Sequence, residues 1–481
     1  MRFFFLSILL TCVFSNISIA QQTETIKAYK SSEKKDSQKV ALSPKEVKID
    51  TFIWSDTLSY QGQKMVVKYT KIPGQALKRD TIFRDKKIET DVATNQITKE
   101  RSNNSTVVVR NEKKKQYQIA LVLSLGSLQY VPKSEIPASS ARSLEFYEGA
   151  KLAIADFQKY NQVFKVKIFD CTNQDESIAT MRKDIMAFQP DLIVGPSSGK
   201  ILDVLAQISD SLGVFLVSPF NNNKSVGTTS AQFIQMVPSV NQLAKKISGL
   251  VKTDAFNNEY KSNYIILGSE EDSFIVNEIK KECTAIGCKG DIPSLISPVM
   301  SAGAVSNLVK ANQHNVFIIP NETDETFVFA CLRELTSIFG NQDEEKSKKV
   351  SVLGMNAWKF FERINLEYYN NLGIYYLENY FFDKKKPEVN RFEERYRVEY
   401  GISPREFAYV GYNSLAIFLE LLMKNGVNLH TPLQSGILES ESSNALVPIF
   451  QFVKRNQVGG YENINLELIQ IQQYEPVLIK E

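Results

Sequence analysis

The segment DLIVGPSSGKILDVLAQISDSLGVFLVSPF, residues 191–220, decides the fold class of this 481-residue chain. Residues 191–195 and 214–218 are short apolar runs rich in Ile, Val and Leu, which is typical of buried strands. Between them, residues 199–212 repeat their apolar side chains at helical spacing. A strand, a helix and a second strand in this order predict a parallel β-α-β unit.

The same alternation extends in both directions from this segment. Further short apolar runs, which predict strands, lie at 118–125, 164–170, 233–237, 264–268, 315–320 and 350–354. Stretches with helical spacing separate many of them, at 140–160, 176–188, 241–251, 273–283 and 326–339. The region from 117 to the end, about 365 residues, is long enough that two wound sheets fit it better than one.

The N-terminus has the features of a secretory signal peptide. Arg2 is followed by an apolar run from Phe3 to Phe14, and Ser18 and Ala20 are small residues placed for cleavage. We expect residues 1–20 to be removed and the protein to be periplasmic. A transmembrane anchor is the alternative, but the run is short for a bilayer, and no second stretch of about 18 apolar residues follows.

Residues 21–115 differ in character from the rest of the chain. Residues 21–45 are polar and charged, which predicts a linker because too little apolar surface offsets the entropy of ordering. Residues 46–90 alternate apolar and polar side chains, most clearly in KMVVKYTKI at 64–72, and predict short strands. Residues 91–115 are again polar. We therefore expect a linker and a small β-containing arm over 21–115.

Composition and motifs exclude several classes of function. The net charge is only +3 and no basic stripe is present, which argues against nucleic-acid binding. H-E-x-x-H does not occur, and the two histidines stand in poor contexts for acid–base chemistry, so we expect no enzyme and no cofactor. With only two histidines, a zinc site is not expected. After export the chain keeps four cysteines; for Cys283 and Cys288 a local disulfide and two free thiols are both open.

Three stretches carry a resemblance to a known family. They are FYEGAKLAIADF at 146–157, the segment 191–220, and FEERYRVEYGISPREFAYVGYNSLAIFLELL at 392–422. In order and spacing they resemble the branched-chain amino-acid-binding (leucine/isoleucine/valine-binding) family of type I periplasmic binding proteins. The resemblance implies two Rossmann-like α/β lobes of parallel sheet flanked by helices, joined by three hinge crossings. Lobe one would comprise 116–238 and 380–435, and lobe two 239–379 and 436–481.

The fold also indicates where a ligand would bind, because open α/β sheets bind ligands beyond the carboxyl ends of their strands. Ser197 and Ser198 precede a predicted helix, whose N-terminus favours an anion. The other candidate ligand-binding residues also follow predicted strands: Ser218, Asn221, Asp272, Ser273, Asn321 and Asn356. For each of them the alternative is an ordinary capping residue. Trp358 and Phe360 follow Asn356 and could line the cleft, but we expect them to pack against a helix.

Two departures from the family bear on the ligand. Gln235 stands where amino-acid-binding members carry an arginine, and the segment GSEEDSF at 268–274 lacks their Asp-x-Tyr-Gly pattern. Our first hypothesis is a receptor that binds a small polar solute, an amino acid or a related molecule, in an interlobe cleft and delivers it to a membrane transporter, such as an ABC transporter, or to a sensor. The alternative is a non-transport envelope protein that uses the fold as a scaffold or regulator, for example of cell-wall synthesis.

Overall fold

The computed structural model describes three strands within residues 52–83 and most of residues 113–480. In the latter range, residues 128–135, 159–162, 196–198, 224–228, 257–259, 289–291, 298, 341–348, 441–444, 448 and 458 are not described. The expected signal peptide and the candidates Ser197 and Ser198 therefore lie outside the described residues. The chain divides into two compact units, residues 1–98 and 99–481.

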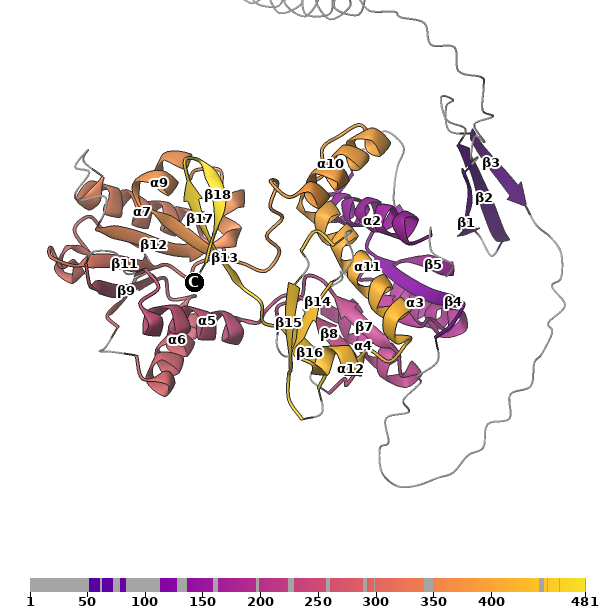
Figure 1. The fold of residues 1–481 in the computed structure, drawn as a ribbon, viewed down its shortest axis with the longest axis horizontal. Helices are drawn as coiled ribbons and strands as arrows, with labels where there is room; N and C mark the ends of the chain where they lie inside the picture. Colours follow the sequence, from indigo (N-terminus) through magenta and orange to yellow (C-terminus); the bar gives the residue numbers. More distant parts are fainter. Residues whose placement is uncertain are drawn as a thin grey trace, which may run out of the picture. The chain divides into compact units, whose positions relative to one another are not determined.

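The first unit contains a three-stranded antiparallel sheet in the order β1-β2-β3 (Figure 1). Its strands are β1 (Phe52–Tyr60), β2 (Gln63–Lys71) and β3 (Lys78–Phe83). In the register of β1 and β2, Trp54 pairs with Tyr69. The short strands predicted in this region are thus present in the described residues as three consecutive antiparallel strands.

Lobe one of the second unit is built on an eight-stranded sheet in the order β14-β15-β16-β8-β7-β6-β4-β5. Six of its strands run parallel, and β14 and β15 join antiparallel at one edge. The strands are β4 (Gln116–Leu123), β5 (Val163–Asp170), β6 (Leu192–Val194), β7 (Phe215–Ser218), β8 (Phe233–Gln235), β14 (Ile437–Glu439), β15 (Ile449–Lys454) and β16 (Tyr461–Asn463).

Helices cover both faces of this sheet. The long helices α2 (Ala138–Phe157) and α11 (Glu406–Asn425) pack on one face, together with α10 (Pro387–Tyr400) and α12 (His430–Gln434). Helices α3 (Asp175–Phe188) and α4 (Gly199–Leu212) pack on the other. The alternating side chains of strands such as β7 supply both cores, because successive residues point to opposite faces.

Lobe two is built on a seven-stranded sheet in the order β10-β9-β11-β12-β13-β17-β18 (Figure 1). The first five strands are parallel, and the last two form an antiparallel hairpin at the edge. The strands are β9 (Ser262–Gly268), β10 (Ser294–Ile296), β11 (His314–Ile318), β12 (Val350–Met355), β13 (Ile374–Glu378), β17 (Glu467–Gln472) and β18 (Glu475–Ile479).

Lobe two also has a core on each face of its sheet. Helices α5 (Val240–Thr253) and α6 (Ser273–Ile286) enclose one core. Helix α7 (Glu325–Phe339), the short α9 (Leu366–Asn371) and the 3-10 helices η2 (Ser306–Leu308) and η3 (Asn356–Phe360) border the other. The predicted fold class, two α/β lobes of mainly parallel sheet, is confirmed.

The chain passes between the two sheets after β8, after β13 and after β16. The last crossing differs from the expected boundary at 436, because β14, β15 and β16 belong to the lobe-one sheet and only β17 and β18 to lobe two. The reason is a close approach: a Cβ on Gly460 would lie 1.9 Å from the carbonyl oxygen of Phe233. Glycine at this position therefore lets β16 align beside β8.

Two glycines allow α2 and α11 to touch through their backbones. A Cβ on Gly149 would lie 1.9 Å from the carbonyl oxygen of Ala408, and one on Gly411 would lie 2.1 Å from that of Phe146. Both glycines belong to the stretches that resembled the binding-protein family. That resemblance therefore has a physical basis, namely a helix contact in the lobe-one core that leaves no room for a Cβ.

Candidate functional site

The candidates Asp272 and Asn321 lie together at the carboxyl edge of the lobe-two sheet. Asp272 Oδ2 accepts hydrogen bonds from the backbone N–H of Ser269 (2.7 Å), the Ser269 hydroxyl (2.9 Å) and Asn321 Nδ2 (2.9 Å). Both side chains are buried, at 8% and 0% exposure. They tie the loop after β9 to the loop after β11.

Asn321 is also held from two other directions. Its Oδ1 accepts from the backbone N–H of Asp324 at 2.8 Å, and Asp324 in turn caps α7. The indole Nε1 of Trp358 donates to the Asn321 carbonyl oxygen at 2.7 Å. Trp358 is buried as expected, whereas Phe360 is 63% exposed. In this structure the side chains of Asp272 and Asn321 bond to each other and to loop groups, and the Ser273 hydroxyl donates to the Glu270 carbonyl.

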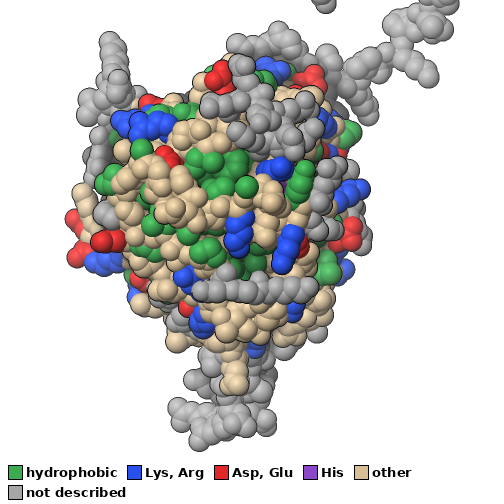
Figure 2. Space-filling view, turned by 90° about the vertical axis from the view of Figure 1, so that its left-hand side faces the viewer, with side chains coloured by type: hydrophobic (Ala, Val, Ile, Leu, Met, Phe, Trp, Pro, Cys, Tyr) green, Lys and Arg blue, Asp and Glu red, His purple; other side chains and the backbone are tan. Residues whose placement is uncertain are grey.

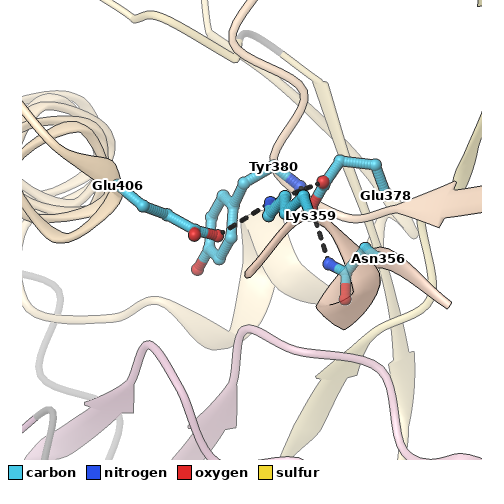
Figure 3. A network of polar contacts seen from close by, with 5 residues as sticks. All are labelled: Asn356, Lys359, Glu378, Tyr380 and Glu406. Atoms are coloured by element: carbon cyan, nitrogen blue, oxygen red, sulfur yellow. Dashed lines mark hydrogen bonds and ion pairs between the residues drawn. The ribbon is translucent and has the colours of Figure 1, made fainter. Parts of the chain in front are cut away.

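Asn356, by contrast, belongs to a network that reaches the other lobe (Figure 3). Its Nδ2 donates to Glu378 Oε1 at 3.0 Å. Lys359 Nζ contacts Glu378 Oε2 at 3.0 Å and Glu406 Oε1 at 3.1 Å. Lys359 is on η3 and Glu378 ends β13, both in lobe two, whereas Glu406 begins α11 on lobe one. Asn356 was a candidate from the sequence, whereas the three charged residues of the network were not.

Burial and charge act against each other in this network. Burial by itself would lower the pKa of Lys359, but the carboxylates of Glu378 and Glu406 outweigh it, and the pKa of Lys359 is raised. Burial raises the pKa of Glu406 although Lys359 opposes the shift. Lys359 therefore stays charged at neutral pH, and one ammonium faces two carboxyl groups.

At the carboxyl edge of the lobe-one sheet, two buried side chains have polar atoms without a hydrogen-bond partner among the described residues. Ser218 ends β7 and Gln235 ends β8, and the two pair in register, so their side chains share one face. Both are fully buried. Among the residues that the structure describes, the Ser218 hydroxyl and Gln235 Oε1 have no hydrogen-bond partner. Gln235 Nε2 donates to the Val237 carbonyl at 2.8 Å.

A third buried polar residue continues this row on the next strand. Glu462 of β16 pairs in register with Gln235 and is 2% exposed. Its Oε1 accepts from the backbone N–H of Ser239 at 2.6 Å. The candidate Asn221 follows β7, is 8% exposed and donates to the Asn223 carbonyl at 3.1 Å. Gln235 was not among the residues predicted to bind a ligand, although a polar residue at the end of a buried strand is a signal for such a position.

Cys283 and Cys288 lie on either side of the C-terminal end of α6. Cys283 and Cys288 are free thiols in this structure, so the disulfide stays a prediction. The backbone N–H of Cys288 donates to the Cys283 carbonyl at 2.9 Å across Gly287, whose φ is +72°. This is the glycine cap that commonly brings such a residue pair into contact. Burial, and then the Cys283 thiol, raise the pKa of Cys288 to about 12.

The part of the chain that the structure describes contains neither a group of metal ligands nor a membrane-spanning helix. There, no group of three or more His, Cys, Asp and Glu side chains is arranged to hold a metal ion. Within the same part of the chain, no helix combines the length and apolar character that a membrane crossing requires.

Comparison with known proteins gives matches in structure and none in sequence. No protein-family model matches the chain, and no curated protein matches it. A protein described as a branched-chain amino acid ABC transporter from Rhodospirillum rubrum is 13% identical, with a TM-score of 0.56, over 76% of this chain and 100% of that one. A branched-chain amino acid ABC transporter periplasmic ligand-binding protein from Burkholderia xenovorans LB400 is also 13% identical, with a TM-score of 0.54, over 76% and 95%.

An ABC transporter substrate-binding protein from Desulfitobacterium hafniense is 15% identical, with a TM-score of 0.51, over 76% of this chain and 100% of that one. At such identities the likeness establishes the fold and leaves the ligand open. The resemblance carried by residues 146–157, 191–220 and 392–422 is confirmed at that level. The chain has the type I periplasmic binding-protein fold.

Proposed function

We propose that this chain is an exported binding protein that holds a small polar solute between its two lobes. The observation that carries the proposal is that two of the buried atoms without a partner among the described residues, Ser218 Oγ and Gln235 Oε1, belong to residues that pair on neighbouring strands. Such atoms are rare in native proteins, because each costs about 1–3 kcal/mol unless a water or a ligand satisfies it. They lie at the strand ends where this fold binds its ligands.

The side chains indicate the chemistry of the solute. Gln235 Oε1 only accepts hydrogen bonds, so its partner must be an N–H or O–H group. The Ser218 hydroxyl both donates and accepts. Because Gln235 is neutral where related amino-acid-binding proteins carry arginine, we favour a solute that presents a hydrogen-bond donor here. Ser197 and Ser198, which directly precede α4 in the sequence, would add hydroxyl groups.

The experiment has two steps. Protein purified from its native envelope is denatured, and any released small molecule is identified by mass spectrometry. Its affinity is then measured by calorimetry for wild type, Ser218→Ala and Ser209→Ala. The Ser209 hydroxyl is buried but bonded to the Val214 carbonyl at 2.6 Å, so Ser209→Ala is a matched control.

The two serine variants should behave in opposite ways. Ser218→Ala should keep or slightly raise the free energy of unfolding, because it removes a buried group without a described partner, and should weaken solute binding by about 2–12-fold. Ser209→Ala should lower stability by about 1 kcal/mol and leave binding unchanged. Solute at 100 times Kd should add about 2.7 kcal/mol of stability. The proposal fails if no molecule is released and a panel of amino acids, peptides, sugars and cell-wall fragments causes no thermal shift.

Two observations favour the alternative, an envelope scaffold or regulator. The chain carries a separate β1-β2-β3 unit. In addition, lobe two exposes large hydrophobic side chains, namely Phe274, Ile296, Val299 and Phe360, at 38–67% exposure. Figure 2 shows one side of the molecule on which hydrophobic side chains gather among lysines and arginines. Apolar surface of this kind marks protein contacts when it is contiguous. A partner captured through it, with no solute-induced thermal shift, would support this function.

A further inference from the structure

One ammonium group connects the two lobes. Lys359 projects from η3, which follows β12 of lobe two, and its Nζ lies 3.1 Å from Oε1 of Glu406. Glu406 is the first residue of α11, the helix that packs through its glycine against α2 in the lobe-one core. The contact therefore joins the last loop before β13 to the rigid part of lobe one (Figure 3).

A carboxylate of lobe two already holds the Lys359 ammonium in place. Glu378, whose side chain is only 5% exposed, accepts from Lys359 through Oε2 and from Asn356 Nδ2 through Oε1. Ordering a lysine side chain normally costs about 1.5–2 kcal/mol of rotamer entropy. Because Glu378 already holds the ammonium on the lobe-two side, the additional contact to Glu406 requires little further ordering.

The pair is also sheltered from solvent. The side chains of Lys359 and Glu406 are 32% and 29% exposed. Fully exposed ion pairs contribute little to stability, since water and salt screen them and their side chains lose entropy on pairing. This pair lies between that limit and a buried pair, and its geometry is set by a second carboxylate. Separation of the lobes would break the contact to Glu406 while the contact to Glu378 stays within lobe two.

We propose that the Lys359–Glu406 ion pair is a latch that holds the two lobes together in the absence of any solute. Where two lobes exchange between arrangements, a contact made in only one of them shifts the populations. The latch favours the arrangement of this structure, in which Lys359 and Glu406 meet. It is a property of this chain's own residues and does not require that a solute binds.

The test measures the lobe arrangement directly, without added solute. Unnatural amino acids at Lys183 on α3 and Ala285 on α6, both exposed, accept donor and acceptor dyes and leave the native cysteines untouched. Single-molecule energy transfer then gives the ratio of molecules in the arrangement of this structure to molecules in any other arrangement. We expect Glu406→Gln and Lys359→Met each to lower this ratio about tenfold, which corresponds to about 1.4 kcal/mol.

The control removes a comparable ion pair within one lobe. Lys281 pairs with Glu278 at 3.1 Å inside α6, so Lys281→Met should leave the distribution as in wild type. The double variant Lys359→Met/Glu406→Gln should match the single variants, because each of the three proteins lacks the same Lys359–Glu406 ion pair. If Lys359→Met folds poorly because it leaves Glu378 buried without its ammonium, the Glu406→Gln result decides. An unchanged ratio in Glu406→Gln would overturn the latch.

Discussion

Replacement of Gly411 by alanine tests whether the contact between α2 and α11 sets the stability of lobe one. The new Cβ would lie 2.1 Å from the Phe146 carbonyl oxygen and 3.0 Å from its Cα, in both cases closer than ordinary contact. The helix backbones must separate, and overpacking of this kind costs about 1–3 kcal/mol. We use the upper value because backbone atoms cannot turn aside. Alanine returns about 1 kcal/mol of helix propensity, so the expected net loss is about 2 kcal/mol.

The control is the same substitution in a helix where there is room. Gly249 lies inside α5, and nothing would stand within 4 Å of its Cβ. Gly249→Ala should therefore raise the free energy of unfolding by up to about 1 kcal/mol. Urea unfolding followed by circular dichroism measures both variants, with lobe-specific probes in case the lobes unfold separately. A Gly411→Ala protein as stable as wild type would refute the packing argument, since the two substitutions differ only in what surrounds them.

Three further predictions concern other parts of the chain. Trp358→Phe should lower the free energy of unfolding by about 1–3 kcal/mol, because the Asn321 carbonyl loses its buried donor, whereas Phe360→Ala should change it by less than about 0.5 kcal/mol in the same urea titration. Burial lowers the pKa of His314, so the stability contributed by its neutral form is present above the unfolded pKa of about 6.5 and is lost as the pH falls toward the folded pKa. His314→Gln should therefore reduce the difference between the urea midpoints at pH 7.5 and pH 5.5. An unchanged difference would exclude His314 as its source. A chain that starts at Lys113 should melt at the wild-type temperature, and a large drop would show that the preceding residues contribute to the core.

The strands and helices could be predicted because their information is local. Runs such as DLIVG and VFLVS, with a helical stretch between them, define a β-α-β unit without reference to distant residues. The last lobe crossing could not be placed in this way. Whether β16 pairs with lobe one depends on its contact with β8, which lies more than 200 residues earlier, and the decisive feature is one glycine at position 460. Hydrophobic pattern carries no information on such a partner.

The same difference between local and long-range information applies to the candidate site. Topology correctly brought Asp272 and Asn321 to one edge, because parallel strands end together. It could not tell that these two side chains bond to each other, since that depends on loop conformation. Lys359, Glu378 and Glu406 were missed because isolated charges in a sequence are most often solvated. Their association arises only when α11 of lobe one meets the loop after β12 of lobe two.

The latch and the proposed solute site are linked by thermodynamics even though they share no residue. A solute that contacts both lobes binds the closed arrangement, so its apparent affinity is its intrinsic affinity multiplied by the closed fraction. If the latched arrangement is also the one that binds solute, the protein does not spend solute-binding energy on bringing the lobes together. Loss of the latch should then weaken solute binding while the Ser218 and Gln235 contacts stay intact. Loss of the Ser218 hydroxyl should weaken binding while the lobe distribution of the free protein stays unchanged. In an envelope scaffold with no solute, the effect of latch loss on solute binding would disappear. The latch would still fix the relative orientation of the two lobes and therefore the surface that a partner meets.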